Sequence, residues 1–233
     1  MSIKYKKIFE GAFIERPNRF IAKVLLNGDT VTVHVKNTGR CRELLVSGCK
    51  VYLSEADNPC RKTRFDLVAV EKRCDDGRVI LINMDSQIPN AAVYEWIAKS
   101  KMFSANAVIR REVTYGDSRF DLSVEDEGNV TFIEVKGVTL ERNGIAMFPD
   151  APTERGTKHL RGLVSAVNNG YNAMVLFVIQ MKGVHEFTPN YATDPVFSET
   201  LHEADSEGVR VMAVDCNVTH DSIEIGNEVS IRL

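Results

Sequence analysis

The sequence predicts two domains: a small β-barrel of the oligonucleotide-binding type in residues 1–84 and an α/β domain in residues 85–233. Three observations lead to this division. Six short segments with alternating apolar residues fill the first part, and helical and strand-like patterns alternate in the second. Residues 1–83 also carry sixteen Lys and Arg against ten Asp and Glu, whereas residues 84–233 carry thirteen against twenty-two. A basic domain is therefore joined to an acidic one.

The barrel prediction depends on short strands that are separated by turn residues. The expected strands are KKIFEGAFIE, RFIAKVLL, TVTVHVK, KVYLSEA, TRFDLVAVEK and RVILIN. Asn27–Gly28 and Asp76–Gly77 are residue pairs that favour tight hairpin turns. Short strands at such regular spacing are typical of a small barrel, and the one helix expected among them is RCRELLVS, after Gly39.

The pattern changes at NMDSQIPN, where Pro89–Asn90 is suited to opening a helix. That helix should continue through AAVYEWIAKSKMF and be followed by the strands AVIRREVTY, SRFDLSVED and NVTFIEVK. A second helix is expected to begin near Thr153, because Leu160 starts an apolar stripe at i, i+3, i+4 and i+7. The remaining elements should be a buried strand NAMVLFVIQ, a helix near PVFSETLHEADSEG and a strand VRVMAVDC.

The composition of the 233-residue chain excludes several protein classes. With 44% hydrophobic and 26% charged residues the chain can bury a sizeable core, and its net charge of -3 gives no overall attraction to nucleic acid. The five cysteines show no CxxC or Cys/His spacing, so neither a disulfide framework nor a structural zinc is expected. The first residues lack a signal peptide, and no segment approaches the roughly 18 apolar residues of a membrane span. We therefore expect a cytoplasmic protein that does not enter a membrane.

A candidate catalytic metal site lies in the consecutive strands of the second domain. Asp121 belongs to the second of these strands, and Glu134 and Lys136 lie two residues apart in the third, so these last two side chains share a face. Charged side chains inside a helix-covered sheet are costly unless they pair or bind something. Carboxylates such as Asp121 and Glu134 hold Mg²⁺ or Mn²⁺, and Lys136 would orient the attacking water or offset the charge that develops. Glu112, on the preceding strand, would complete the acidic cluster.

A structural interpretation accounts for the same residues. In it, Glu134 and Lys136 form an exposed cross-strand ladder of charges, and Asp121 is a solvated residue at a strand end. Glu112 has arginines close by on the same hairpin, which are natural ion-pair partners. The two interpretations differ in whether these side chains are buried.

Basic residues around the second helix of this domain are predicted to contact phosphates. Arg142, Lys158 and Arg161 lie in RNGIAMFPDAPTERGTKHLRG, which includes the N-terminus of the helix. His159 flanks the apolar stripe and should look toward the sheet, and we assign it to the same nucleic-acid-binding group. The structural alternatives are a solvated basic face and an internal histidine.

The barrel carries a second group of predicted nucleic-acid contacts at strand ends. Its members are Arg16, Arg19, Lys36, Asn37 and Arg40. The turn at residues 37–39 could offer backbone donors to a phosphate. Phe13 and Phe20 are interleaved with these residues and could stack on bases, although core packing is the commoner role of a phenylalanine in a strand.

The segments RFIAKV, HVKNTGR, REVTYGDSRFDL, EVKGVTL and FPDAPTERGTKHL, with the late DP and GV elements, resemble the sugar fermentation stimulation protein family over nearly the whole chain. The resemblance implies an N-terminal oligonucleotide-binding-like barrel and a C-terminal domain similar to the PD-(D/E)XK nucleases, in a family described as binding DNA. It places Asp121 and Glu134-Val135-Lys136 on the acidic and Glu-x-Lys elements, with Glu112 as the upstream acid. The family name also implies a regulatory link to sugar use.

The leading functional hypothesis is a protein that binds single- or double-stranded DNA and contains a divalent-metal phosphodiesterase site. The main alternative is a non-catalytic regulator of sugar metabolism genes that binds DNA with little sequence preference and keeps the nuclease architecture. A third hypothesis is an RNA-processing enzyme. A homodimer would suit an enzyme that cuts two strands.

Overall fold

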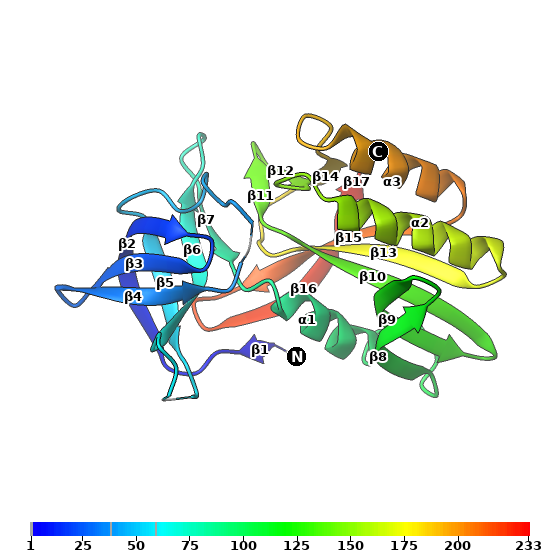
Figure 1. The fold of residues 1–233 in the computed structure, drawn as a ribbon, viewed down its shortest axis with the longest axis horizontal. Coiled ribbons are helices and arrows are strands. Elements are labelled where there is room, and N and C mark those ends of the chain that lie inside the picture. The colour runs from blue at the N-terminus through cyan, green and yellow to red at the C-terminus, as the bar shows by residue number, and fades with distance from the viewer. Residues whose placement is uncertain (1, 38, 59) are drawn as a thin grey trace.

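Antiparallel hairpins build the first third of the chain in the computed structural model, which describes residues 2–37, 39–58 and 60–233. The strands of this part form a sheet of order β4-β3-β2-β5-β6-β7, and β4 also pairs in parallel with β6, so that five strands close into a barrel (Figure 1). The strands are β2 (Ile8–Asn18), β3 (Ile21–Leu26), β4 (Asp29–Val35), β5 (Lys50–Glu55), β6 (Phe65–Arg73) and β7 (Val79–Asn83). The predicted small barrel of the oligonucleotide-binding type is confirmed.

The helix expected at RCRELLVS is wrong, because turns occupy this segment between β4 and β5. Cys41 has a φ of 45°, outside the helical region, and Leu45 N–H donates to the Cys41 carbonyl across a single turn at 3.0 Å. Leu44 and Leu45 are buried in the core. An eight-residue segment is too short to form a stable helix by itself, so its packing against the barrel decides its shape.

The rest of the chain forms an α/β region with a sheet of order β1-β16-β15-β13-β10-β9-β8. Its central strands β10, β13 and β15 are parallel, and its outer strands are antiparallel. The strands are β1 (Ile3–Lys4), β8 (Val108–Tyr115), β9 (Ser118–Asp126), β10 (Asn129–Val138), β13 (Asn172–Ile179), β15 (Arg210–Val218) and β16 (Ser222–Glu228). The first strand of the chain therefore belongs to the sheet of the α/β region, so the N-terminal segment joins both regions.

Helices cover both faces of this sheet (Figure 1). The helix α1 (Ile88–Ile97) lies on one face, and α2 (Glu154–Asn168) and α3 (Pro195–Ser206) lie on the other. Thr153 caps α2, since its hydroxyl accepts a hydrogen bond from the Gly156 N–H at 3.0 Å. A second, four-stranded sheet contains β11 (Leu140–Arg142), β12 (Ile145–Phe148), β14 (Glu186–Pro189) and β17 (Ser230–Ile231). None of the described helices combines the length and apolarity needed to cross a bilayer.

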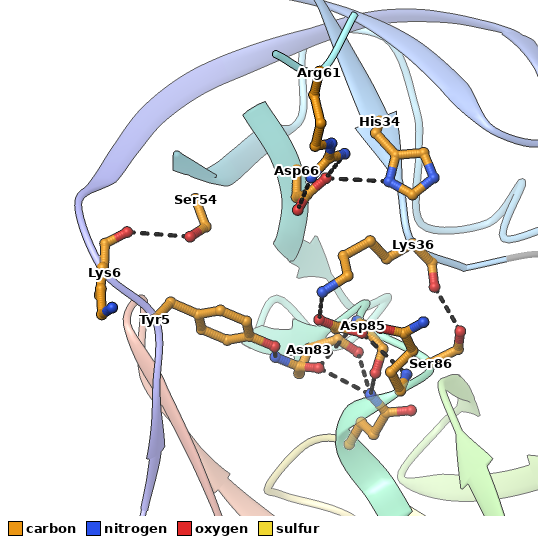
Figure 2. A network of polar contacts seen from close by, with 12 residues as sticks. Tyr5, Lys6, His34, Lys36, Ser54, Arg61, Asp66, Asn83, Asp85 and Ser86 are labelled. Atoms are coloured by element: carbon orange, nitrogen blue, oxygen red, sulfur yellow. Dashed lines mark hydrogen bonds and ion pairs between the residues drawn. The ribbon is translucent and has the colours of Figure 1, made fainter. Parts of the chain in front are cut away.

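The junction between the barrel and the α/β region is polar (Figure 2). The ammonium of Lys36 contacts the fully buried carboxylate of Asp85 at 2.6 Å, and the hydroxyl of Ser86 donates to the Lys36 carbonyl. Asn83 donates to the hydroxyl of Tyr5, in the segment between β1 and β2. Burial, together with the charge of Asp85, raises the pKa of Tyr5, so its hydroxyl stays neutral. These contacts fix the end of β4 beside the segment that leads into α1.

Candidate functional site

Asp121 lies where β9 separates from β10. The two strands pair as far as Ile133 and Leu122, and their ladder ends there. The carboxylate of Asp121 then takes the place of a ladder partner, because its Oδ2 accepts a hydrogen bond from the Val135 N–H at 2.8 Å. Its Oδ1 accepts a hydrogen bond from the side chain of Asn90, in the first turn of α1, at 2.6 Å. The position of Asp121 is thus fixed from β10 and from α1.

Glu134 lies in β10 beside Asp121 and is almost completely buried, with 2% of its surface exposed. Its Oε1 accepts hydrogen bonds from Lys136 Nζ at 2.5 Å and from His159 Nδ1. Its Oε2 is also buried and has no hydrogen-bond partner among the described residues. This burial excludes the interpretation of Glu134 and Lys136 as an exposed ladder of charges.

The two carboxylates have opposite pKa shifts. Burial, followed by the charge of Glu134, raises the pKa of Asp121. Burial also acts to raise the pKa of Glu134, but the hydrogen bond from His159 and the charge of Lys136 outweigh it, so the net shift is downward. The negative charge of the pair is therefore held mainly on Glu134.

His159 is buried in α2 and bonded on both ring nitrogens. The Nε–H of Arg155 donates to His159 Nε2 at 3.4 Å, and a guanidinium can only donate, so Nε2 is an acceptor. Nδ1 must then carry the proton that is donated to Glu134. The structure therefore places His159, predicted as a nucleic-acid contact, behind Glu134, where it orients the carboxylate.

Asn90 and Arg155 support the site through contacts that sequence reasoning missed. In the sequence, Asn90 looks only like part of a helix start, and its contact with Asp121 joins positions 31 residues apart. Arg155 had a local signal, since it precedes His159 by four residues and shares a helix face with it. That signal becomes informative only when His159 is known to face the sheet.

The other predicted residues of the α/β region lie outside this cluster. Glu112, half exposed on the edge strand β8, forms an ion pair with Arg119 at 3.0 Å, and no described contact joins it to Asp121 or Glu134. Arg142 is exposed at the end of β11 in the four-stranded sheet. The exposed side chains of Lys158 and Arg161 line an outward-facing pocket of about 370 Å³ beside α3.

On the barrel, Arg16 holds the backbone of two loops. Its guanidinium donates to four carbonyl oxygens, which belong to Arg19, Asn37, Gly39 and Arg40. These N–H groups already have acceptors within the protein and are not available to a phosphate. Asn37 is buried, and its side-chain oxygen accepts from the Gly39 N–H at 2.8 Å. Of the predicted turn at residues 37–39, Thr38 lies outside the described residues.

The cluster has the chemistry of a small cation site, with two hard carboxylate ligands and one oxygen without a donor. Among the residues that the structure describes, no group of three or more His, Cys, Asp or Glu side chains is arranged to hold a metal ion. Asp121 and Glu134 would therefore hold a metal together with backbone groups, water or substrate. An ion that keeps several water ligands, as Mg²⁺ does, fits such a pair.

These features define a class of protein in which an oligonucleotide-binding barrel is joined to an α/β domain with a buried carboxylate–lysine cluster. Family models match both parts: the "SfsA N-terminal OB domain" at residues 14–82 and the "Sugar fermentation stimulation protein RE domain" at residues 87–222. The chain belongs to the sugar fermentation stimulation protein family. The resemblance identified from the sequence motifs is confirmed.

Similar proteins span the full length of the chain. A sugar fermentation stimulation protein homolog from Desulfitobacterium hafniense (strain Y51) is 53% identical over 99% of both chains. A homolog from Ruminiclostridium cellulolyticum is 52% identical over 99% of this chain and 100% of its own. The solved structure of SfsA from Pyrococcus furiosus in complex with Ca²⁺ matches with a TM-score of 0.87 and 26% identity, over 99% of this chain and 98% of that one.

Proposed function

We propose that this protein binds DNA and hydrolyses phosphodiester bonds with Mg²⁺ or Mn²⁺ held by Asp121 and Glu134. The observation that carries the proposal is the buried Oε2 of Glu134, which has no hydrogen-bond partner among the described residues, while Oε1 has two. A buried acceptor without a donor is costly, and a cation is the ligand that would remove this cost. The Ca²⁺ complex of the Pyrococcus furiosus relative supports a divalent cation as a ligand of this fold.

Each residue of the cluster has a role in this proposal. Asp121 and Glu134 would hold the ion, which would polarise the phosphodiester and favour deprotonation of an attacking water. Asn90 fixes one oxygen of Asp121, and His159 fixes Oε1 of Glu134, which leaves Oε2 as the oxygen that would hold the ion. Lys136 is partly exposed and would offset the negative charge that develops on the phosphate.

The test compares the wild type with Lys136→Ala on labelled linear duplex and single-stranded DNA, with Mn²⁺, Mg²⁺ or a chelator. Binding and cleavage are scored in the same samples. We expect metal-dependent cleavage by the wild type. The rate should fall about 100-fold or more in the variant, because the variant lacks the lysine ammonium beside the reacting phosphate. Lys99→Ala, which removes an exposed lysine at the end of α1, should cleave like the wild type. Equal cleavage by wild type and Lys136→Ala would contradict the assignment.

A DNA-binding protein without catalysis is the second candidate. It is favoured by the saturation of the other groups in the cluster, since both oxygens of Asp121 and the ammonium of Lys136 have partners within the protein. Tight DNA binding without cleavage, with either Mn²⁺ or Mg²⁺ present, would support this second function over the first. Competition with matched RNA oligonucleotides in the same assay separates both candidates from an RNA-processing enzyme, because a 2′-hydroxyl is what such a site discriminates.

A further inference from the structure

Two loops of the barrel are held together as one unit, which we call the Arg16 loop pair. It consists of residues 18–20, from the end of β2 to the start of β3, and of the described residues of 36–40, after β4. The guanidinium of Arg16 lies between the loops and donates to backbone carbonyls of both at 2.6 to 2.9 Å. A group with many donors thereby fixes the backbone, so the side chains of the loops project from a defined frame.

The loop pair presents an aromatic ring to solvent. The structure describes all eleven phenylalanines of the chain, and only Phe20 is exposed, at 51%. The carbonyl of Phe20 accepts from the Val35 N–H, and the side chain of Asn18 accepts from the Phe20 and Ile21 N–H groups. The guanidinium of Arg19 lies 5.8 Å from the centre of the ring. The ordered backbone thus keeps a large apolar ring exposed to water. A flexible loop could have folded back and buried the ring.

The loop pair is also tied to the elements that build the carboxylate–lysine cluster. The Arg40 N–H donates to Asp150 Oδ2 at 3.2 Å, and Asp150 lies between β12 and α2, the helix that carries His159. Lys36 binds Asp85, just before α1 (Figure 2). The turn between β2 and β3 lies on the side of the barrel that faces the α/β region (Figure 1). The loop pair therefore has a fixed position relative to the cluster.

We propose that Phe20, in the same loop pair as Arg19 and Arg40, stacks on an unpaired base of the nucleic-acid strand that enters the carboxylate–lysine cluster. This inference rests on the proposed function and narrows its substrate to nucleic acid with a single-stranded segment. Bases inside a duplex already stack on their neighbours, so a protein ring gains most from an unpaired base. The two arginines have no ion-pair partner among the described residues and are free to meet the flanking phosphates.

The experiment measures binding by fluorescence anisotropy in chelator, so that no strand is cut. The probes are a labelled oligothymidylate and a fully paired blunt-ended duplex of the same length, titrated with wild type and Phe20→Ala over a range of salt concentrations. Phe20→Ala should weaken oligothymidylate binding about 5- to 150-fold with an unchanged salt dependence, because stacking involves no counterion release. Binding of the fully paired duplex should stay the same. Arg19→Gln and Arg40→Gln should each reduce the salt slope for the single strand by about 0.7.

Leu25→Ala is the matched control, because Leu25 is an exposed apolar residue of β3 outside the loop pair. It should bind both probes like the wild type, and all variants should keep the wild-type urea midpoint, since they alter exposed side chains. Wild-type affinity of Phe20→Ala for the single strand overturns the stacking assignment while leaving DNA binding intact. Equal losses on both probes overturn it as well. If the wild type binds neither probe, the proposed function fails and this inference fails with it.

Discussion

Buried carboxylate–lysine pairs occur both at the domain junction and in the candidate site, but their oxygens are satisfied differently. At the junction, Glu141 Oε2 accepts from Lys72 at 2.5 Å and Oε1 accepts from the Gly144 N–H at 2.6 Å. In the site, Glu134 receives both of its donors on Oε1 and none of the described donors on Oε2. The two carboxylates have almost the same burial. They differ in whether a hydrogen-bond donor reaches each of the two carboxylate oxygens.

This difference separates a structural charge from a functional one. A buried ion pair is tolerated when every lone pair has a partner, and such saturation leaves no capacity to bind a ligand. A carboxylate with an unsatisfied oxygen lowers the stability of the free protein, and the binding of a cation recovers the loss.

The largest effect is expected at the junction, from Lys36→Met. This change leaves the fully buried Asp85 without its cation. The free energy of unfolding should fall by about 3 kcal/mol, the lower end of the range for breaking a buried pair, because the Lys36 side chain is 24% exposed. Urea unfolding followed by circular dichroism measures the change.

The double variant Lys36→Met/Asp85→Asn is the control for this prediction. Removing both charges should recover most of the lost stability, because no unpaired charge then remains buried. If the double variant is as unstable as Lys36→Met, the loss of stability comes from packing. The claim that Lys36 stabilises a buried charge at the junction would then be wrong.

Periodicity predicted the longer elements of the fold, and it failed where elements are short or pairing is distant. The barrel strands, the helix α2 and the strands from β8 to β10 contain enough alternation or helical spacing to be recognised, whereas α1 was recognised from the Pro89–Asn90 pair that opens it. The strands β11, β12, β14 and β17 have two to four residues, too few to show a period. The pairing of β1 with β16 joins the two ends of the chain, and no local pattern encodes it.

The next largest effect is expected on metal affinity, from changes at His159. Its Nδ1–H holds Glu134 Oε1, and loss of such a supporting hydrogen bond typically weakens metal binding 10- to 100-fold. His159→Gln should show a loss of about this size for Mn²⁺ in isothermal titration calorimetry. His159→Asn should bind Mn²⁺ within a few-fold of the wild type, because the asparagine amide lies where Nδ1 does. Equal affinities of these two variants would contradict the assigned hydrogen bond.

The candidate site shows the same division between local and distant signals. Glu134 and Lys136 could be predicted because they lie two residues apart on one strand, and Asp121 because it lies on the neighbouring strand. The support that Asn90 gives to Asp121 comes from another element. Arg16 looked like a phosphate contact because charge and position are visible in a sequence, whereas the carbonyls that occupy its guanidinium are not.

A smaller effect is expected in the pH dependence of stability, where the two regions should respond with opposite sign. Asp121 has a raised pKa in the folded protein, so its contribution to stability falls as pH rises from its ordinary value of 3.8 through the raised value. Glu141 has a lowered pKa, since its bonds to Lys72 and Gly144 outweigh burial, so its contribution is present above 4.5 and lost as pH falls through the folded value.

Urea midpoints measured across this pH range test the signs. Relative to wild type, Asp121→Asn should gain stability as pH rises, and Glu141→Gln should be less stable near neutral pH and converge with wild type in acid. The amide of Asn90 can rotate to accept from the new asparagine, so Asp121→Asn keeps its hydrogen bonds. If the urea midpoints of the two variants, relative to wild type, changed with pH in the same direction, the opposite pKa shifts of Asp121 and Glu141 would be contradicted.

The smallest effect is expected from Glu112→Gln, which tests where the candidate site ends. Glu112 and Arg119 form an ion pair whose side chains are 50% and 64% exposed, and exposed pairs contribute about 0.5 kcal/mol or less. The variant should therefore unfold like the wild type, and its affinity for Mn²⁺ should be unchanged, because Glu112 makes none of the described contacts with Asp121 or Glu134. A 10-fold or larger loss of Mn²⁺ affinity would make Glu112 a third acidic ligand. Glu112 would then have to leave its ion pair with Arg119 in the metal-bound protein.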